Sequence, residues 1–128
     1  MIKIDVSAGE LFDKISILNI KKRKIENKDK LINVTKELEL LNEIGETYKK
    51  IDNEVFEKFM QQLTQINQRL WDIEDEIRNY EKNKIFDDKF IELARSVYIN
   101  NDERFNIKSN INSYYGSDIQ EEKEYVEY

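Results

Sequence analysis

The chain has 128 residues, a length that suits one ordinary domain with its own core, and its formal net charge is −6. Because it contains neither cysteine nor histidine, disulfides, thiolate nucleophiles, zinc–thiolate sites and histidine general bases are excluded. The acidic balance disfavours nucleic acid as a partner, and the lack of an 18-residue apolar run or a signal-peptide core predicts a cytoplasmic protein without membrane contact.

Few helix breakers interrupt the sequence. There is no proline and there are only three glycines, while apolar side chains recur at steps of three and four residues. We therefore predict an all-α fold, an antiparallel bundle of about four helices arranged as two helix hairpins, in a single domain that covers residues 1–128.

The first helix is predicted at residues 8–26. Before it, apolar and polar residues alternate over 1–6, which we interpret as an extended N-terminal arm. Ser7 and Glu10 have the spacing of a capping box, in which each side chain bonds a free backbone N–H group. The helix ends in the basic run Lys21–Lys24, which complements the helix dipole; a patch that binds an anion or nucleic acid is the alternative interpretation.

The second helix is predicted at residues 30–44, with Asp29 as its N-cap and Gly45 just after its end. The connection that precedes it is short, so the first two helices should pack as an antiparallel hairpin. Residues 46–51 are interpreted as either a loop or the start of the next helix.

The third helix is predicted to start after Asp52 or Asn53 and to end near Asn83. Its apolar seam consists of Phe59, Leu63, Ile66, Leu70, Ile73, Ile77 and Tyr80. Trp71 lies beside this seam, which favours a core position over a stacking platform. A helix of this length spans roughly 40 Å, so its free end should carry an exposed apolar strip that favours a homodimer.

The fourth helix is predicted from the cap-like Asp87 to about Tyr114, and Gly116 ends it. Its inner stripe includes two polar residues, Asn100 and Arg104, which need partners if they are buried. We expect the third helix to provide these partners through Glu74, Asp75 and Arg78. Residues 117–128 hold five acids and one lysine and are predicted to form an acidic tail partly docked on the bundle; the Lys21–Lys24 run is one surface that it could bind.

Several sequence blocks together resemble a family of short, mainly bacterial proteins that is known as a domain of unknown function. The resemblance covers most of the chain and implies no activity. The blocks that carry it are Ser7–Ile15, Leu70–Arg78, Phe90–Tyr98, Asn101–Arg104, Gly116–Ser117 and Glu121–Lys123.

Charged and polar residues of these blocks form the candidate site. We interpret them first as an ion-pair network between helices that fixes their register, and second as a site for a ligand or partner. Tyr98, Asn101 and Arg104 share one broad face, where they could bind a carboxylate or a phosphate. The candidates are Glu10, Asp13, Lys14, Trp71, Glu74, Asp75, Arg78, Arg95, Tyr98, Asn101, Asp102 and Arg104.

An enzymatic alternative rests on a loose resemblance to the all-α nucleotide pyrophosphohydrolases of the MazG type. This resemblance implies Mg²⁺ held by carboxylates of neighbouring helices, with Lys14 or Arg95 on the phosphates. The chain lacks the paired-glutamate motif of those enzymes at its usual spacing. The carboxylates concerned are Glu10, Asp13, Glu74 and Asp75.

The leading functional hypothesis is a small cytoplasmic interaction or accessory module that presents helical surfaces to a second copy or to another protein. Long apolar seams, negative charge and the lack of a strong catalytic set favour it. This hypothesis requires no cofactor and no resident metal.

Overall fold

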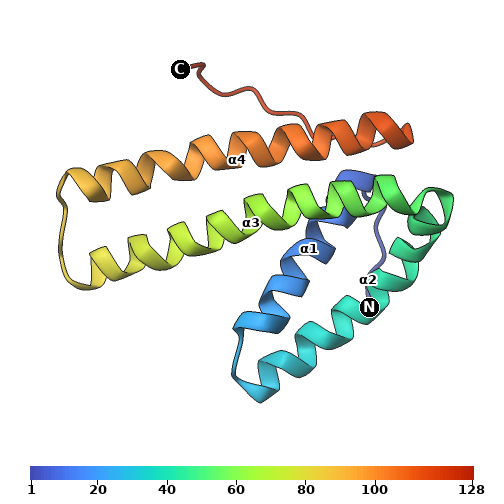
Figure 1. Cartoon of the computed structure of the whole chain (residues 1–128), viewed down its shortest axis with the longest axis horizontal. Coiled ribbons are helices and arrows are strands. Elements are labelled where there is room, and N and C mark those ends of the chain that lie inside the picture. The colour runs from blue at the N-terminus through green and yellow to red at the C-terminus, as the bar shows by residue number, and fades with distance from the viewer.

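The computed structural model describes residues 1–128, and its only regular elements are α1 (Ala8–Lys24), α2 (Lys28–Ile51), α3 (Asn53–Lys82) and α4 (Asp88–Tyr115). Helices α1 and α2 form one hairpin and α3 and α4 form a longer one, and the shorter hairpin lies across one half of the longer (Figure 1). The predicted all-α bundle of two antiparallel hairpins is thereby confirmed. None of the four helices combines the length and the apolar character that crossing a membrane requires.

Three helices begin at the residues that their capping signals predict. The side-chain oxygens of Ser7, Asp52 and Asp87 each accept a hydrogen bond of 3.1 Å from the backbone N–H group three residues further on. At the other end of the chain, Gly116 adopts a left-handed φ of 62° after the last turn of α4. Because glycine has no Cβ, this conformation costs it little, and α4 ends there as expected.

The predicted end of the second helix was wrong. Helix α2 starts at Lys28, with Asn27 rather than Asp29 as its N-cap, and it continues through Gly45 to Ile51. Gly45 is buried against α1, and an added Cβ would lie 3.0 Å from Ile15 Cδ1. The glycine thus permits close helix packing instead of ending the helix. Only Asp52 separates α2 from α3.

The core lies where the two hairpins cross. Phe12 of α1 is fully buried at its centre and makes edge-to-face contacts with Tyr48, Phe56 and Tyr115, at centroid distances of 5.1–5.4 Å. Each such aromatic pair contributes about 0.5–1.5 kcal/mol of stability beyond the contribution from burying the rings. Aliphatic side chains from all four helices complete this core: Leu11, Ile15, Leu18, Val34, Leu38, Leu63, Ile66 and Ile111.

Helices α3 and α4 extend together beyond α1 and α2 as a two-helix arm (Figure 1). Along this arm Ile73, Ile77 and Tyr80 of α3 are half-buried, and Leu93 of α4 is buried. The apolar seam of α3 is therefore partly covered by α4 in the same chain. The freely exposed strip that was expected at the end of the third helix is not found there.

Helices α1 and α4 approach each other closely at Gly9. Its backbone N–H donates a 2.7 Å hydrogen bond to Asn112 Oδ1, and a Cβ at this position would lie 2.6 Å from the carbonyl oxygen of Lys108. Only glycine lets the first turn of α1 pack directly against the backbone of α4. This contact positions Glu10 and Asp13 opposite the basic residues of α4.

We predict that Gly9→Ala lowers the free energy of unfolding by about 2 kcal/mol or more, because the methyl group meets backbone that cannot move alone. Gly45→Ala is the matched control. Its methyl group meets the end of a flexible side chain, and alanine gains about 1 kcal/mol of helix propensity over glycine. Urea denaturation of both variants measures the difference, and equal stability would contradict the proposed close contact at Gly9.

Candidate functional site

A buried ion pair joins α1 to α4. Asp13 is only 1% exposed, and both of its oxygens accept hydrogen bonds from Arg104, through Nε at 3.0 Å and through Nη2. Asn67 of α3 donates a further 2.9 Å hydrogen bond to Asp13 Oδ1 and a 3.2 Å bond to Ser16 Oγ. The carboxylate is thus held by groups from two other helices, as a buried charge requires.

A second cation extends this pair into a network. Lys108 Nζ lies 2.9 Å from Glu10 Oε2, 2.8 Å from Glu121 Oε2 and 3.9 Å from Asp13 Oδ2. The carboxylate of Glu10 therefore bonds Lys108 and does not complete the capping box with Ser7. Through Glu121 the C-terminal tail becomes part of the same network. We call Glu10, Asp13, Arg104, Lys108 and Glu121 the ion network.

The surroundings raise the pKa of both basic residues. For Arg104 the hydrogen bonds to Asp13 are the largest cause, and they outweigh the opposite effect of burial on the pKa. For Lys108 burial is the largest single influence and lowers the pKa, but the hydrogen bonds to Glu121 and Glu10 and the negative charges of Asp13 and Glu10 together outweigh it, so the pKa is raised. Both side chains are therefore firmly cationic at neutral pH.

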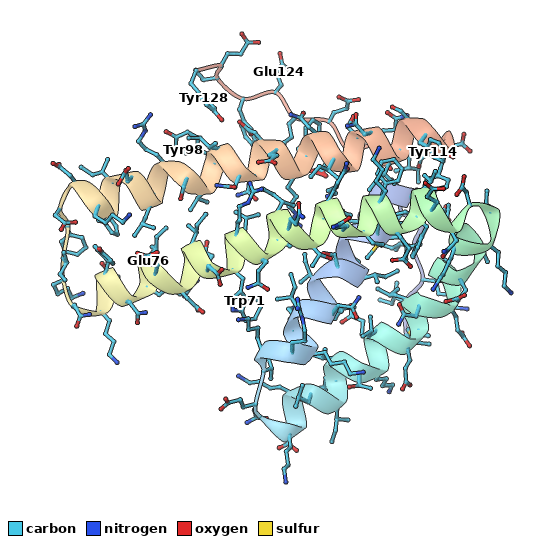
Figure 2. All side chains as sticks on the ribbon, viewed as in Figure 1. Trp71, Glu76, Tyr98, Tyr114, Glu124 and Tyr128 are labelled. Carbon is cyan, nitrogen blue, oxygen red and sulfur yellow. The ribbon has the colours of Figure 1, made fainter.

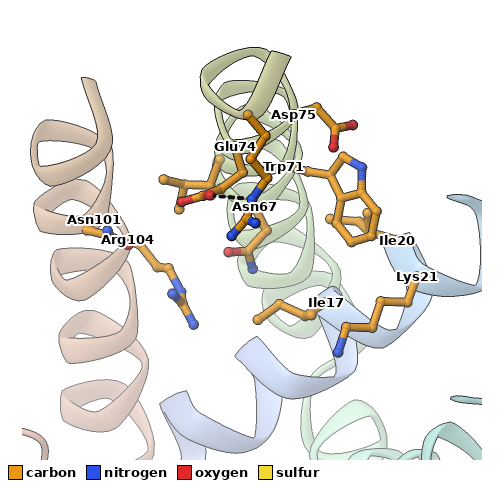
Figure 3. Close-up of a pocket in the computed structure, with 11 residues that line it drawn as sticks. Ile17, Ile20, Lys21, Asn67, Trp71, Glu74, Asp75, Asn101 and Arg104 are labelled. Atoms are coloured by element: carbon orange, nitrogen blue, oxygen red, sulfur yellow. Dashed lines mark hydrogen bonds and ion pairs between the residues drawn. The ribbon is translucent and has the colours of Figure 1, made fainter. Parts of the chain in front are cut away.

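Beside the network lies a notch of about 570 Å³ between α1, α3 and α4. Lys21 and Arg104 extend into it from opposite sides, and Trp71 lies against Ile20 on one wall (Figure 3). Its residues come from one turn of α1, three turns of α3 and one turn of α4. They are Ile17, Ile20, Lys21, Asn67, Leu70, Trp71, Glu74, Asp75, Arg78, Asn101 and Arg104.

Eight of the twelve candidate residues lie in the network or the notch, and one of them, Arg104, belongs to both. The network contains Glu10 and Asp13, and the notch contains Trp71, Glu74, Asp75, Arg78 and Asn101.

The expected partners of the polar residues on the α4 stripe were wrong. Arg104 binds Asp13 of α1 and not the acidic residues of α3, because the crossing of the hairpins places α1 against this part of α4. Asn100 donates to the backbone oxygen of Ser96 within its own helix. On α3, Arg78 pairs at 3.3 Å with Glu74 one turn away.

Four further candidates lie outside both features. Lys14 is exposed, 3.9 Å from Glu10, and Arg95 is exposed on the arm with no ion pair in the chain. Tyr98 and Asp102 lie on the outer side of α4, where they meet the end of the tail. Tyr128 donates a hydrogen bond to Asp102 and packs edge-to-face on Tyr98 (Figure 2).

The tail follows α4 on the side away from α3, as Figure 1 shows, and does not reach the basic run at the end of α1. Besides the Glu121 and Tyr128 contacts, Lys123 Nζ lies 5.2 Å from the ring centroid of Phe105. The tail is thus partly docked, as predicted, but on a surface that the sequence did not indicate.

The four carboxylates of the Mg²⁺ alternative are divided between two places. Glu10 and Asp13 bind the cations of the network, while Glu74 and Asp75 line the notch. No group of three or more acidic side chains has an arrangement that could hold a metal ion. The geometry therefore gives this alternative no assembled metal site.

Sequence reasoning missed several members of the site. Lys108 and Asn112 follow Arg104 at steps of four along one face of α4, and this polar repeat was the available signal. Asn67 and Ser16 gave no signal of their own, since single amides and hydroxyls on helices are common on surfaces. For Lys21 the sequence indicated only a place in the basic run at the end of the first helix.

The family with the description "Family of unknown function (DUF6165)" matches residues 2–127. No curated protein matches the chain. No solved structure matches it either.

We predict that Asp13→Asn lowers the free energy of unfolding by about 3 kcal/mol or more, because it leaves the guanidinium of Arg104 without its charged partner. Glu74→Gln removes an ion pair on the surface and should cost less than about 0.5 kcal/mol. Chemical denaturation of the two variants tests this contrast. A loss for Asp13→Asn as small as that for Glu74→Gln would contradict a structural role for the buried pair.

The raised pKa of Lys108 predicts a loss of stability in alkali. Because the pKa of Lys108 is raised in the folded state, its protonated form stabilises the fold. This contribution is fully present below the ordinary pKa of 10.5, and it is lost as the pH rises through the folded pKa. Unfolding free energies measured between about pH 9 and about pH 12 should therefore fall more steeply for wild type than for Lys108→Met. The exposed Lys14→Met variant should keep the slope of wild type; equal slopes for all three proteins would contradict the prediction.

Proposed function

The chain belongs to the DUF6165 family, and we propose from its geometry that it is a small helical interaction module that pairs with a second copy of itself through the outer face of α2. The observation that carries this proposal is a second apolar seam on α2, separate from the seam that faces the core. Two further features support the proposal: charged residues flank this seam, and the buried acidic residues bind cations within the chain.

The outer seam consists of Leu40, Ile44, Thr47 and Ile51, at steps of four, three and four residues. Its three aliphatic side chains are 42%, 52% and 69% exposed, while Leu38 and Gly45 on the adjoining face are buried. The spacing is that of alternating d and a positions in a heptad repeat. In a coiled coil, a row of aliphatic side chains at this spacing is covered by a partner helix.

The charges beside this seam favour a second copy as the partner. Glu43 and Lys50 both take the g position, both are exposed, and neither makes an ion pair within the chain. In an antiparallel two-fold pairing Leu40 lies opposite Ile51 of the second copy. The same register brings Glu43 beside Lys50 of the second copy, and the two-fold axis repeats this ion pair.

The ion network supports an interaction module over a carboxylate-based enzyme. Glu10 and Asp13 are bound to Lys108 and Arg104, so using them on a substrate would break buried ion pairs. The acids of the notch, Glu74 and Asp75, stand apart from them. The carboxylates most suited to chemistry by their burial thus have structural partners already.

We predict that wild type sediments as a dimer and that Glu43→Lys and Lys50→Glu each shift it toward monomer, because each places like charges across the interface. The double variant Glu43→Lys/Lys50→Glu restores opposite charges and should restore the dimer. Analytical ultracentrifugation over a concentration series measures this, and far-ultraviolet circular dichroism confirms that each variant is folded.

Ile44→Glu is a stronger disruption of the same seam and should give a folded monomer. Ile91→Glu is its control, since Ile91 is 55% exposed on the arm, away from α2. A monomeric wild type, or single charge variants as dimeric as wild type, would overturn the proposal.

A further inference from the structure

We infer that the notch between α1, α3 and α4 binds a small phosphate ester whose other end carries hydroxyl or amino donors. This site is independent of the proposed pairing, because no residue of α2 lines the notch. The inference rests on polar groups from three helices that face the notch without partners, on one half-buried aromatic ring between them, and on the order in which these groups are arranged.

Two cations mark the phosphate end. Lys21 forms no ion pair in the chain, and Figure 3 shows it directed into the notch from α1 while Arg104 enters from α4. Asp13 binds only Nε and Nη2 of Arg104, so Nη1 keeps its donors free. The buried carboxylate also fixes the direction of the guanidinium. A preoriented guanidinium and an opposing ammonium are suited to the several oxygens of a phosphate.

Amides add neutral hydrogen-bonding groups at the same end. The side chain of Asn101 makes no hydrogen bond within the protein, although it lies beside Arg104 on the wall of the notch. Asn67 is only 6% exposed and spends its Nδ2 donors on Asp13 and Ser16, which leaves its Oδ1 without a donor. This oxygen remains accessible to solvent, so it can accept a hydrogen bond from a water molecule that bridges it to a phosphate oxygen.

The opposite end of the notch has a different chemistry. The Trp71 ring lies half-buried against Ile20, and its Nε1 donates to no protein atom (Figure 3). Beyond the ring, the carboxylate of Asp75 has no ion-pair partner in the chain. An indole face next to a free carboxylate favours a ring that packs on the aromatic surface and donates hydroxyl or amino hydrogens.

Size and charge agree with such a ligand. A volume of about 570 Å³ lies within the range of small-molecule sites. The rim acid Glu74 is neutralised by Arg78, so the anion meets Lys21 and the outer edge of Arg104 without a competing free carboxylate at that end. The carboxylate of Asp75 remains free to accept hydrogen bonds from the hydroxyl or amino groups at the other end of the ligand. The polarity of the notch therefore sets the direction in which the ester binds.

Trp71 is the only tryptophan of the chain, so its fluorescence reports on the notch directly. We would titrate the protein with ribose 5-phosphate, inorganic phosphate and ribose. A saturable fluorescence change with ribose 5-phosphate, a weaker affinity for inorganic phosphate and no response to ribose are the expected results. A missing response to ribose 5-phosphate would overturn the inference, and equal affinity for phosphate and the ester would overturn its donor end.

Variants separate the two ends of the ligand. Lys21→Ala should weaken ribose 5-phosphate binding about tenfold, the effect of one charge-assisted hydrogen bond, while the neighbouring exposed Lys22→Ala should leave it unchanged. Asp75→Asn should weaken the ester and not inorganic phosphate. Equal binding by Lys21→Ala, Lys22→Ala and wild type would contradict the site. The Ile44→Glu variant should bind as wild type does, so failure of the pairing proposal and failure of this one remain distinguishable.

Discussion

The buried ion pair between Asp13 and Arg104 is the interaction on which the arrangement of the helices depends. It joins the second turn of α1 to the middle of α4, and Asn67 connects α3 to the same carboxylate. Hydrophobic packing alone tolerates small shifts of one helix along another, whereas a bidentate pair in the interior is satisfied in one register only. The absence of a Cβ at Gly9 is what lets these groups meet, because it brings α1 onto the backbone of α4.

Arg104 gives this structural pair a second consequence. One edge of its guanidinium is fixed by a buried carboxylate and the other faces the notch, so the cost of orienting a flexible side chain is met during folding and not during binding. For the same reason, the sequence alone could not separate the residues that hold the helices together from those that could bind a ligand. Arg104 stabilises the fold, and it is also the residue that we propose to contact the ligand.

The sequence was sufficient for local structure and insufficient for contacts between helices. Ser7, Asp52, Asp87 and Gly116 act through neighbours in the chain, so their capping roles could be predicted. Gly45 could not be interpreted in this way, because a glycine ends helices and also permits close packing, and the contact with Ile15 that decides between them is thirty residues distant. Arg104 was likewise assigned to α3, since nothing local indicates that the hairpins cross with α1 against α4. The pairing of Lys108 with Glu121 depends on the course of the tail, which no periodic pattern determines.

The proposed pairing surface on α2 and the proposed ligand site in the notch are connected only through the crossing of the two hairpins. The outer seam of α2 and the notch have no residue in common, but α1 packs on α2 with one face and lines the notch with another. A ligand changes pairing only if it binds the two association states with different affinity, so independent surfaces are the expectation for a rigid α1. The burial of Phe12, Ile15, Ser16 and Ile20 along that helix argues for such rigidity, since a shift of α1 would disturb the core and the ion network together. Binding in the notch and pairing through α2 should therefore behave as separate properties of one fold.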